Sequence, residues 1–80
     1  MTTPPKHIIK GRLWVLPGSR EYEFWPDTGS VVRGKVEFKG VTPRAQTLAL
    51  EMIVPGTICS IELDSDPHTS FRPTLIQVMP

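Results

Sequence analysis

Short runs of apolar residues alternate with proline- and glycine-containing breaks along this chain of 80 residues. The breaks recur about every ten residues, which is typical of a small all-β sandwich or barrel. Within the runs, polar and apolar side chains alternate, and successive side chains of a strand point to opposite faces. The alternation therefore predicts a sheet with one buried face and one exposed face.

The pattern predicts six strands. Five of them are defined by alternating or short apolar runs, and they cover residues 8–16, 20–25, 31–39, 57–63 and 74–79. The run at 31–39 is the clearest, because its apolar residues fall on one side and its charged residues on the other. A glycine on the apolar side of a strand indicates a bend or a bulge. Gly11 and Gly34 hold such positions, so we expect the sheet to curve there.

The sixth segment, residues 42–54, fits both a helix and a strand. Thr42-Pro43 is a typical helix start, and the apolar residues of Ala45–Ile53 have helical spacing. Read as a strand, alternate residues of Leu48–Val54 line one side. We favour the strand, because Pro55-Gly56 then joins it to the next strand as a hairpin. The proline also pushes the residue before it into extended geometry.

The expected fold is therefore all-β, a small antiparallel barrel of six strands. The alternative is an α+β fold with one short helix near residues 43–53. Residues 7–80 are expected to form one β-barrel domain, since a chain of this length makes a single domain. Residues 1–6 are expected to be a disordered N-terminal tip, because Pro4 and Pro5 lack an amide hydrogen and nothing apolar anchors them.

Charge, cysteine content and hydropathy limit the classes of function. The net charge is +1 and the pI is about 7.9, lower than is usual for a nucleic-acid-binding domain. A single cysteine excludes an internal disulfide and a cysteine-rich metal site. The N-terminus lacks the apolar stretch of a signal peptide, and no segment approaches the roughly 20 apolar residues of a membrane span. We therefore expect a cytoplasmic protein with no membrane partner.

The residue types used in catalysis are few and scattered. Cys59 lies mid-strand between apolar neighbours, which is typical of a buried thiol. His7 follows the N-terminal tip, and His68 lies in a polar loop. The loop Asp64–His68 offers two carboxylates and no glycine, too few ligands for calcium or zinc. The sequence therefore predicts a protein that is not an enzyme and has no cofactor or metal.

Basic and aromatic side chains share the outward positions of the predicted strands. The candidate binding residues are Lys10, Arg12, Trp14, Trp25, Arg33, Lys35 and Lys39. Exposed tryptophan and arginine are the usual anchors of protein interfaces, so the first hypothesis is a binding or interaction module with a protein partner. Basic groups with an interleaved aromatic ring also suit single-stranded nucleic acid, so the alternative is an RNA- or single-stranded-DNA-binding barrel. The pattern leaves open the oligomeric state and whether the tryptophans are core or surface residues.

Two segments resemble the C-terminal β-barrel of elongation factor Tu. The first is EMIVPGTICSIELDSDPHTSFRPTLIQV (residues 51–78), in which a methionine-bearing strand, a Pro-Gly turn, an apolar strand, a proline-containing loop and a last strand follow in that order. The second is IIKGRLWVLPGSREYEF (residues 8–24), which is similar to that barrel's first long strand and the loop after it. The resemblance implies a six-stranded antiparallel barrel used for RNA or protein contact.

Overall fold

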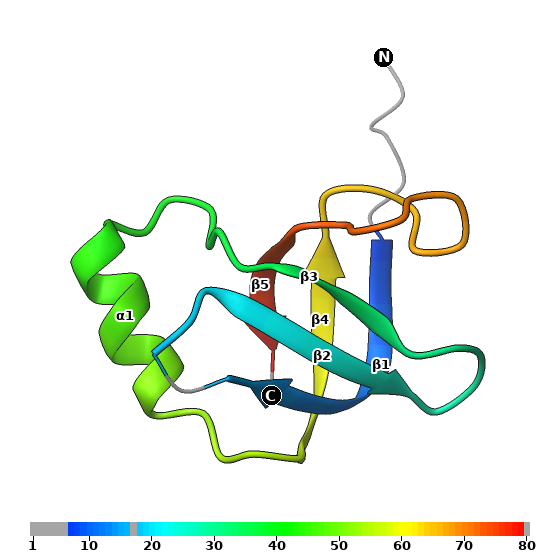
Figure 1. Ribbon diagram of the computed structural model, residues 1–80, viewed down its shortest axis with the longest axis horizontal. Helices are drawn as coiled ribbons and strands as arrows, with labels where there is room; N and C mark the ends of the chain where they lie inside the picture. The colour runs from blue at the N-terminus through cyan, green and yellow to red at the C-terminus, as the bar shows by residue number, and fades with distance from the viewer. Residues whose placement is uncertain (1–6, 17, 80) are drawn as a thin grey trace.

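The computed structural model describes residues 7–16 and 18–79, so the tip expected at residues 1–6 lies outside the described residues. Five strands and one helix follow along the chain (Figure 1). They are β1 (His7–Val15), β2 (Glu21–Pro26), β3 (Val32–Lys35), α1 (Pro43–Glu51), β4 (Thr57–Leu63) and β5 (Leu75–Met79).

The strands form one antiparallel sheet in the order β3-β2-β1-β4-β5, with β1 in the middle. β1 is long enough to pair with β2 through Gly11–Val15 and with β4 through His7–Leu13. The sheet curls into a half-barrel with β3 and β5 at its edges, and directly after β3 one isolated parallel bridge joins Val36 to Leu75 of β5. The expectation of six strands in a closed barrel is therefore wrong, whereas a small, curled and mostly antiparallel sheet is confirmed.

The strand expected at residues 31–39 is shorter than the alternation suggested. Beyond β3 the chain leaves β2 and approaches β5, where the amide of Glu37 donates to the carbonyl of Leu75 at 2.9 Å. The amide of Lys39 donates to Ile76 at the same distance. The side chains still alternate between inside and outside, because the backbone stays extended while it changes neighbours. Alternation alone cannot reveal which strand a segment pairs with.

The core fills the concave side of the sheet. Its fully or nearly buried apolar residues are Leu13, Tyr22, Phe24, Val32, Val36, Cys59, Ile61, Leu63 and Leu75. All of them stand at positions that the alternation assigned to the inner face or to an apolar run. Gly11 and Gly34 are also buried, and a Cβ at Gly11 would overlap the carbonyl oxygen of Trp25. A side chain at that position is therefore incompatible with the close approach of β1 and β2.

The segment at 42–54 contains a helix, so the strand favoured there is wrong. The Thr42 hydroxyl accepts a hydrogen bond from the amide of Ala45 at 3.2 Å, which caps the first turn. Pro43 occupies the first turn, where its missing amide hydrogen costs nothing. Good helix formers follow up to Leu50. The preference of Val54 for an extended backbone acts only after the helix has ended. It therefore determines the conformation that follows the helix and not that of residues 43–51.

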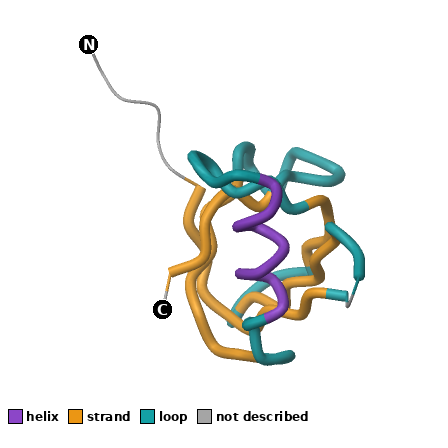
Figure 2. The backbone as a smooth tube through the Cα atoms, turned by 90° about the vertical axis from the view of Figure 1, so that its left-hand side faces the viewer, coloured by secondary structure: helices purple, strands orange, loops and turns teal. Residues whose placement is uncertain are grey.

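α1 covers one side of the curled sheet (Figure 2). Its inward residue Gln46 is buried, and its amide oxygen accepts from the amide of Phe38 at 2.8 Å. The Gln46 Nε2 donates to the carbonyl of Val36 at 3.1 Å. Leu50 and Ile53 pack against the core. The side chain of Gln46 thus satisfies backbone groups that a neighbouring strand would otherwise satisfy.

Candidate interaction surface

Two tryptophans stand together on the convex side of the sheet. In the pairing of β1 with β2, Trp14 lies opposite Glu23 and Arg12 lies opposite Trp25, so the two indoles are diagonal neighbours. Arg12 also lies opposite Ile58 of β4, and Glu23 lies opposite Arg33 of β3. We call this surface, which four strands build, the tryptophan face, and it consists of Arg12, Trp14, Glu23, Trp25, Arg33 and Ile58.

A chain of hydrogen bonds fixes Trp25. Its indole Nε1 donates to the Glu23 carboxylate at 2.6 Å, and the other oxygen of that carboxylate accepts from Arg33 Nε at 3.0 Å. These two bonds, from Trp25 first and Arg33 second, lower the pKa of Glu23 below its ordinary value of 4.5. The carboxylate is therefore ionised at neutral pH and orients the ring while half of Trp25 stays exposed to solvent.

Trp14 supports Trp25 from the side. The two ring centroids are 5.3 Å apart and the ring planes are inclined by 50°, within the range of favourable aromatic pairs. Gly56 approaches Trp14 so closely that a Cβ there would lie 3.1 Å from the indole. Arg12 donates to the Gly56 carbonyl at 3.2 Å. The question that the sequence left open is thus answered: Trp14 is partly buried and Trp25 is a half-exposed surface residue.

The candidate cations divide into three groups. Arg12 and Arg33 belong to the tryptophan face and are held by hydrogen bonds, Arg12 to the Gly56 carbonyl and Arg33 to Glu23. Lys10 and Lys35 are exposed beside it, on β1 and β3. Lys39 lies apart, because the chain has left β2 by then and its backbone bonds to Ile76 of β5. Of the candidate binding residues, Lys39 is the one that the structure does not bring to this surface.

Sequence reasoning missed three residues of interest. Ile58 is 58% exposed beside Arg12, and its outward position was readable from alternation although its neighbours were not. Glu23 orders the tryptophan face, but only the strand register reveals its partners. Phe71 is 94% exposed in the loop between β4 and β5. It adjoins Arg72, which pairs with Glu21 of β2 at 3.4 Å, and no periodic pattern marks that loop.

The residues with catalytic chemistry are dispersed. Cys59 is buried in the core, and burial raises the pKa of its thiol, which opposes formation of a nucleophilic thiolate. His68 is exposed in the loop, where Asp66 accepts a hydrogen bond from its backbone amide. Tyr22 donates its hydroxyl to the Pro73 carbonyl at 2.7 Å, and burial raises its pKa. Within residues 7–16 and 18–79, no three histidine, cysteine or acidic side chains gather as metal ligands.

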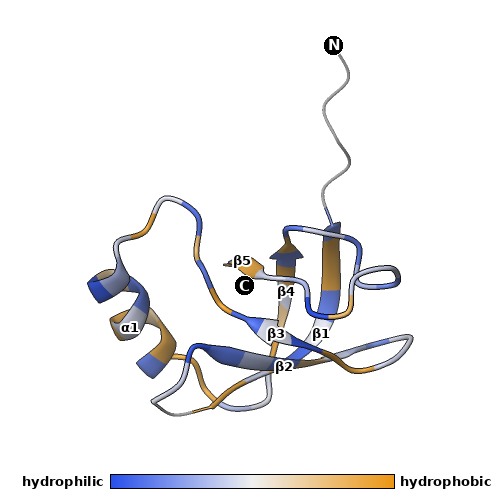
Figure 3. Cartoon of the chain, turned by 45° about the horizontal axis from the view of Figure 1, so that its top comes forward, coloured by the Kyte–Doolittle hydropathy of each residue, from blue (hydrophilic) through white to orange (hydrophobic). Residues whose placement is uncertain are grey.

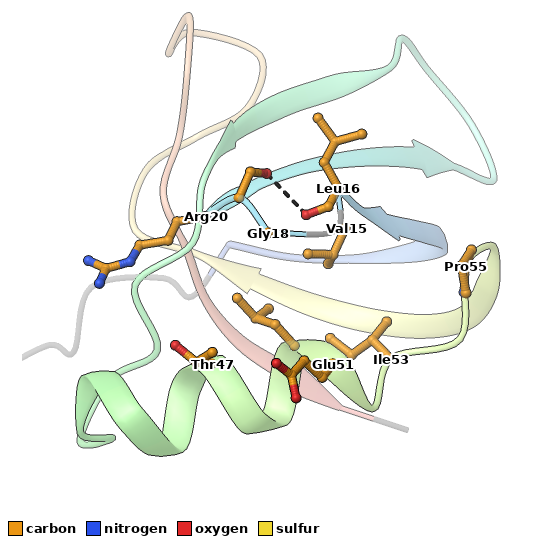
Figure 4. Close-up of a pocket in the computed structure, with 10 residues that line it drawn as sticks. Val15, Leu16, Gly18, Arg20, Thr47, Glu51, Ile53 and Pro55 are labelled. Atoms are coloured by element: carbon orange, nitrogen blue, oxygen red, sulfur yellow. Dashed lines mark hydrogen bonds between the residues drawn. The ribbon is translucent and has the colours of Figure 1, made fainter.

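A groove of about 490 Å³ runs between α1 and the chain that follows β1 (Figure 4). Its apolar lining includes Val15, Leu50 and Ile53. Among the described lining residues, the ionisable ones are Arg20 and Glu51. The hydroxyls of Ser19 and Thr47 also line the groove, but each donates to a backbone carbonyl, of Leu16 and Pro43 respectively, and not to a side-chain base. The lining therefore shows no hydrogen-bonded pair of nucleophile and base.

No protein-family model, no curated protein and no solved structure matches this chain. These comparisons therefore leave the resemblance to the elongation factor Tu barrel untested. In the described part of the chain, no helix has the length and apolar character needed to cross a membrane. The structure defines a class of fold, a curled five-stranded antiparallel sheet that is covered by one short helix and carries an ordered aromatic surface.

Proposed function

We propose that this protein is a small, non-enzymatic interaction module that binds a protein partner through the tryptophan face. The observation that carries the proposal is the half-exposed Trp25, held between Trp14 and Glu23 beside the exposed Ile58. Tryptophan and arginine are the residues that most often dominate the binding energy of protein interfaces. An exposed aromatic and aliphatic cluster with arginines around it has the composition of an interface centre.

The order of the tryptophan face supports the proposal. An interface residue that is mobile in the free protein loses conformational entropy on binding, at about 0.5–1.5 kcal/mol per side chain. Trp25 has already lost most of that freedom, because Glu23 holds its N–H and Trp14 packs against its ring. A partner therefore meets a preformed apolar platform.

The charges favour a protein over a nucleic acid. Arg33 is paired with Glu23, so its positive charge is largely compensated in the middle of the surface. The Glu23 carboxylate itself would repel a phosphate backbone. Arg12, Lys10 and Lys35 remain as exposed cations without an ion pair among the described residues. Three cations give a smaller electrostatic term than the six to ten phosphate contacts of a typical nucleic-acid complex.

Nucleic-acid binding is the second candidate, and one observation favours it. Partly open five-stranded barrels include domains that bind oligonucleotides on the face of their second and third strands, and here Trp25, Arg33 and Lys35 lie on β2 and β3. Indole rings flanked by lysine are also a stacking platform for single-stranded bases.

The test is capture of partners by the tagged full-length chain after nuclease treatment, comparing the wild type with Trp25→Ala. Phe71→Ala is the control, because it removes an aromatic ring that is even more exposed than Trp25 from a loop outside the tryptophan face. We expect a protein retained by the wild type and by Phe71→Ala, and an affinity at least 30-fold lower for Trp25→Ala, the loss typical of a hot spot of about 2 kcal/mol.

Two outcomes contradict the proposal. Equal affinity of the wild type and Trp25→Ala for the captured protein would place the interface elsewhere. Binding that disappears after nuclease treatment, and that weakens with salt in proportion to the phosphate contacts of Lys10 and Lys35, would instead establish the nucleic-acid candidate.

A further inference from the structure

The outward side of α1 is apolar and uncovered. Leu48 is 55% exposed and Met52 is 83% exposed, and Ala45 and Ala49 on the same side of the helix are exposed as well. We call these four residues the outer helix stripe. A surface helix ordinarily turns its apolar stripe to the core and its polar face to water. Here the residue that points inward at the centre of the helix is the polar Gln46.

Helical geometry accounts for this reversal. Successive residues are rotated by about 100°, so Leu48 points about 160° away from Leu50 and Gln46, which face the sheet. Met52 lies one turn beyond Leu48 on the same side. Figure 3 shows apolar and polar segments side by side on α1, at the margin of the molecule and away from the strands. The side chains of the outer helix stripe therefore lie exposed on the side of α1 that faces away from the sheet.

The charged residues at the two ends of α1 have the opposite sign to those that stabilise an isolated helix. Arg44 stands in the first turn, which favours acids, and Glu51 stands in the last turn, which favours bases. They are seven residues apart, so they lie two turns apart on the same flank of the stripe. Neither takes part in an ion pair in the described part of the chain.

We propose that two copies of this chain associate through α1, packed antiparallel about a two-fold axis that passes near Leu48. The antiparallel order brings each Arg44 level with the partner's Glu51, so both charges gain a counterion. Ala45 and Ala49 let the two backbones approach closely, while Leu48 and Met52 bury their exposed surface. Identical patches that complement themselves are what a two-fold interface requires.

The charges favour a second copy over an unrelated partner. The flank of the outer helix stripe carries a cation, Arg44, at one end and an anion, Glu51, at the other. A second copy of the helix in antiparallel orientation places the opposite charge beside each of them. A partner surface of one sign would be repelled at one end. The helix has nine residues and is thus about 13.5 Å long, so the contact lies at the small end of specific interfaces. The dimer should therefore be weak, with a dissociation constant of roughly micromolar to millimolar.

The first experiment is sedimentation equilibrium of the full chain from about 10 μM to 1 mM, the range set by that affinity. We expect a reversible monomer–dimer equilibrium. Leu48→Glu should raise the dissociation constant at least tenfold, because it places a charge at the centre of the contact. Ile8→Glu is the matched control: Ile8 is 47% exposed, similar to Leu48, but it stands on β1. A monomer at every concentration overturns the proposal, and so does a dimer that Leu48→Glu leaves intact or that Ile8→Glu weakens equally.

A charge exchange separates association from folding. Arg44→Glu and Glu51→Arg each remove both intermolecular pairs, and we expect each to weaken the dimer about threefold to tenfold. Each also improves the match to the dipole of α1, so the melting temperature of the dilute monomer should not fall. The double variant restores both pairs with reversed sign and should dimerise like the wild type.

An equimolar mixture of the two single variants should form a heterodimer. The Arg44→Glu copy then presents acids at both positions and the Glu51→Arg copy presents bases at both. A double variant that stays as weak as the single ones, or a mixture without heterodimers, would contradict the antiparallel arrangement. The residues tested here are absent from the tryptophan face, so either proposal can fail without the other.

Discussion

The convex surface of the sheet and the outer side of α1 are both apolar and exposed, but they are ordered by different means. On the sheet, strand pairing places Trp14, Glu23 and Trp25 side by side; a hydrogen bond joins Trp25 to Glu23, and Trp14 packs against Trp25. On the helix, Leu48 and Met52 have no such support, and α1 itself is fastened to the sheet through Gln46 and two apolar contacts. The exposed apolar residues of the tryptophan face are thus held by their neighbours, whereas those of α1 stand on a helix that has few contacts with the sheet.

The largest effect is expected from a change that breaks the sheet. Gly11→Ala places a Cβ against the Trp25 carbonyl and about 2.7 Å from the Cα of Pro26. Because both neighbours are backbone, β1 and β2 must separate, and we expect a loss of about 3 kcal/mol in the free energy of unfolding. Urea denaturation measures it. Lys10→Ala, an exposed change on the same strand, should stay within about 0.5 kcal/mol, and equal losses for the two would show that the close approach is unimportant.

The attachment of the helix is tested by Gln46→Ala. The change leaves the amide of Phe38 and the carbonyl of Val36 without their partner, and each unsatisfied buried group costs about 1–3 kcal/mol. Entry of water relieves part of this, so we expect a loss of about 2 kcal/mol in urea denaturation. Hydrogen exchange of α1 should accelerate more than that of β1. Thr47→Ala, the exposed neighbour, is the control, and equal exchange in both variants would mean that Gln46 does not hold the helix.

A smaller effect is expected at the start of the helix. Thr42→Ala removes the hydroxyl that accepts from Ala45, and loss of such a cap costs about 1 kcal/mol. Thr42→Ser keeps the hydroxyl and should retain most of the stability. Thermal melting followed by circular dichroism compares the two variants, and identical midpoints would show that the cap contributes nothing.

The smallest effect concerns pH. The pKa of Glu23 is lowered in the folded protein, so its contribution to stability is complete above 4.5 and disappears as the pH falls through the lower, folded-state value. Tryptophan fluorescence should therefore change with a midpoint below 4.5 while the far-ultraviolet circular dichroism stays native. In Glu23→Gln this transition should be absent. Its persistence there would assign the fluorescence change to another group.

The sequence allowed some of these features to be predicted and not others, for physical reasons. The period of two placed Leu13, Tyr22 and Phe24 inside, because burial follows strand geometry directly, but it left open whether Trp25 lies inside or outside. The helix at Pro43–Glu51 was only the alternative prediction, because the Pro55-Gly56 turn, outside the element, was given more weight than the cap at Thr42.

The tryptophan face was predicted only as a group of side chains. Its order depends on register, which links Trp14 to Glu23 and Glu23 to Arg33 across three strands. Register is a property of pairing and is not visible in one strand. After β3 the chain leaves β2 and bonds to β5, which separates Lys39 from the other candidate binding residues. The sequence does not show which of these two strands a segment pairs with.

The central position of β1 has a consequence for biosynthesis. Of the described strands β1 is synthesised before the others and finds β2 almost at once, but its other neighbour, β4, begins only at Thr57. Until β4 is synthesised, the edge of β1 that will pair with it keeps unsatisfied backbone amides next to apolar side chains such as Ile9. An open strand edge of this kind is a template for intermolecular pairing. A translational pause or a truncation before Leu63 should therefore yield an aggregation-prone fragment. Once β4 is present, it pairs with β1 across a long sequence separation and the sheet can form.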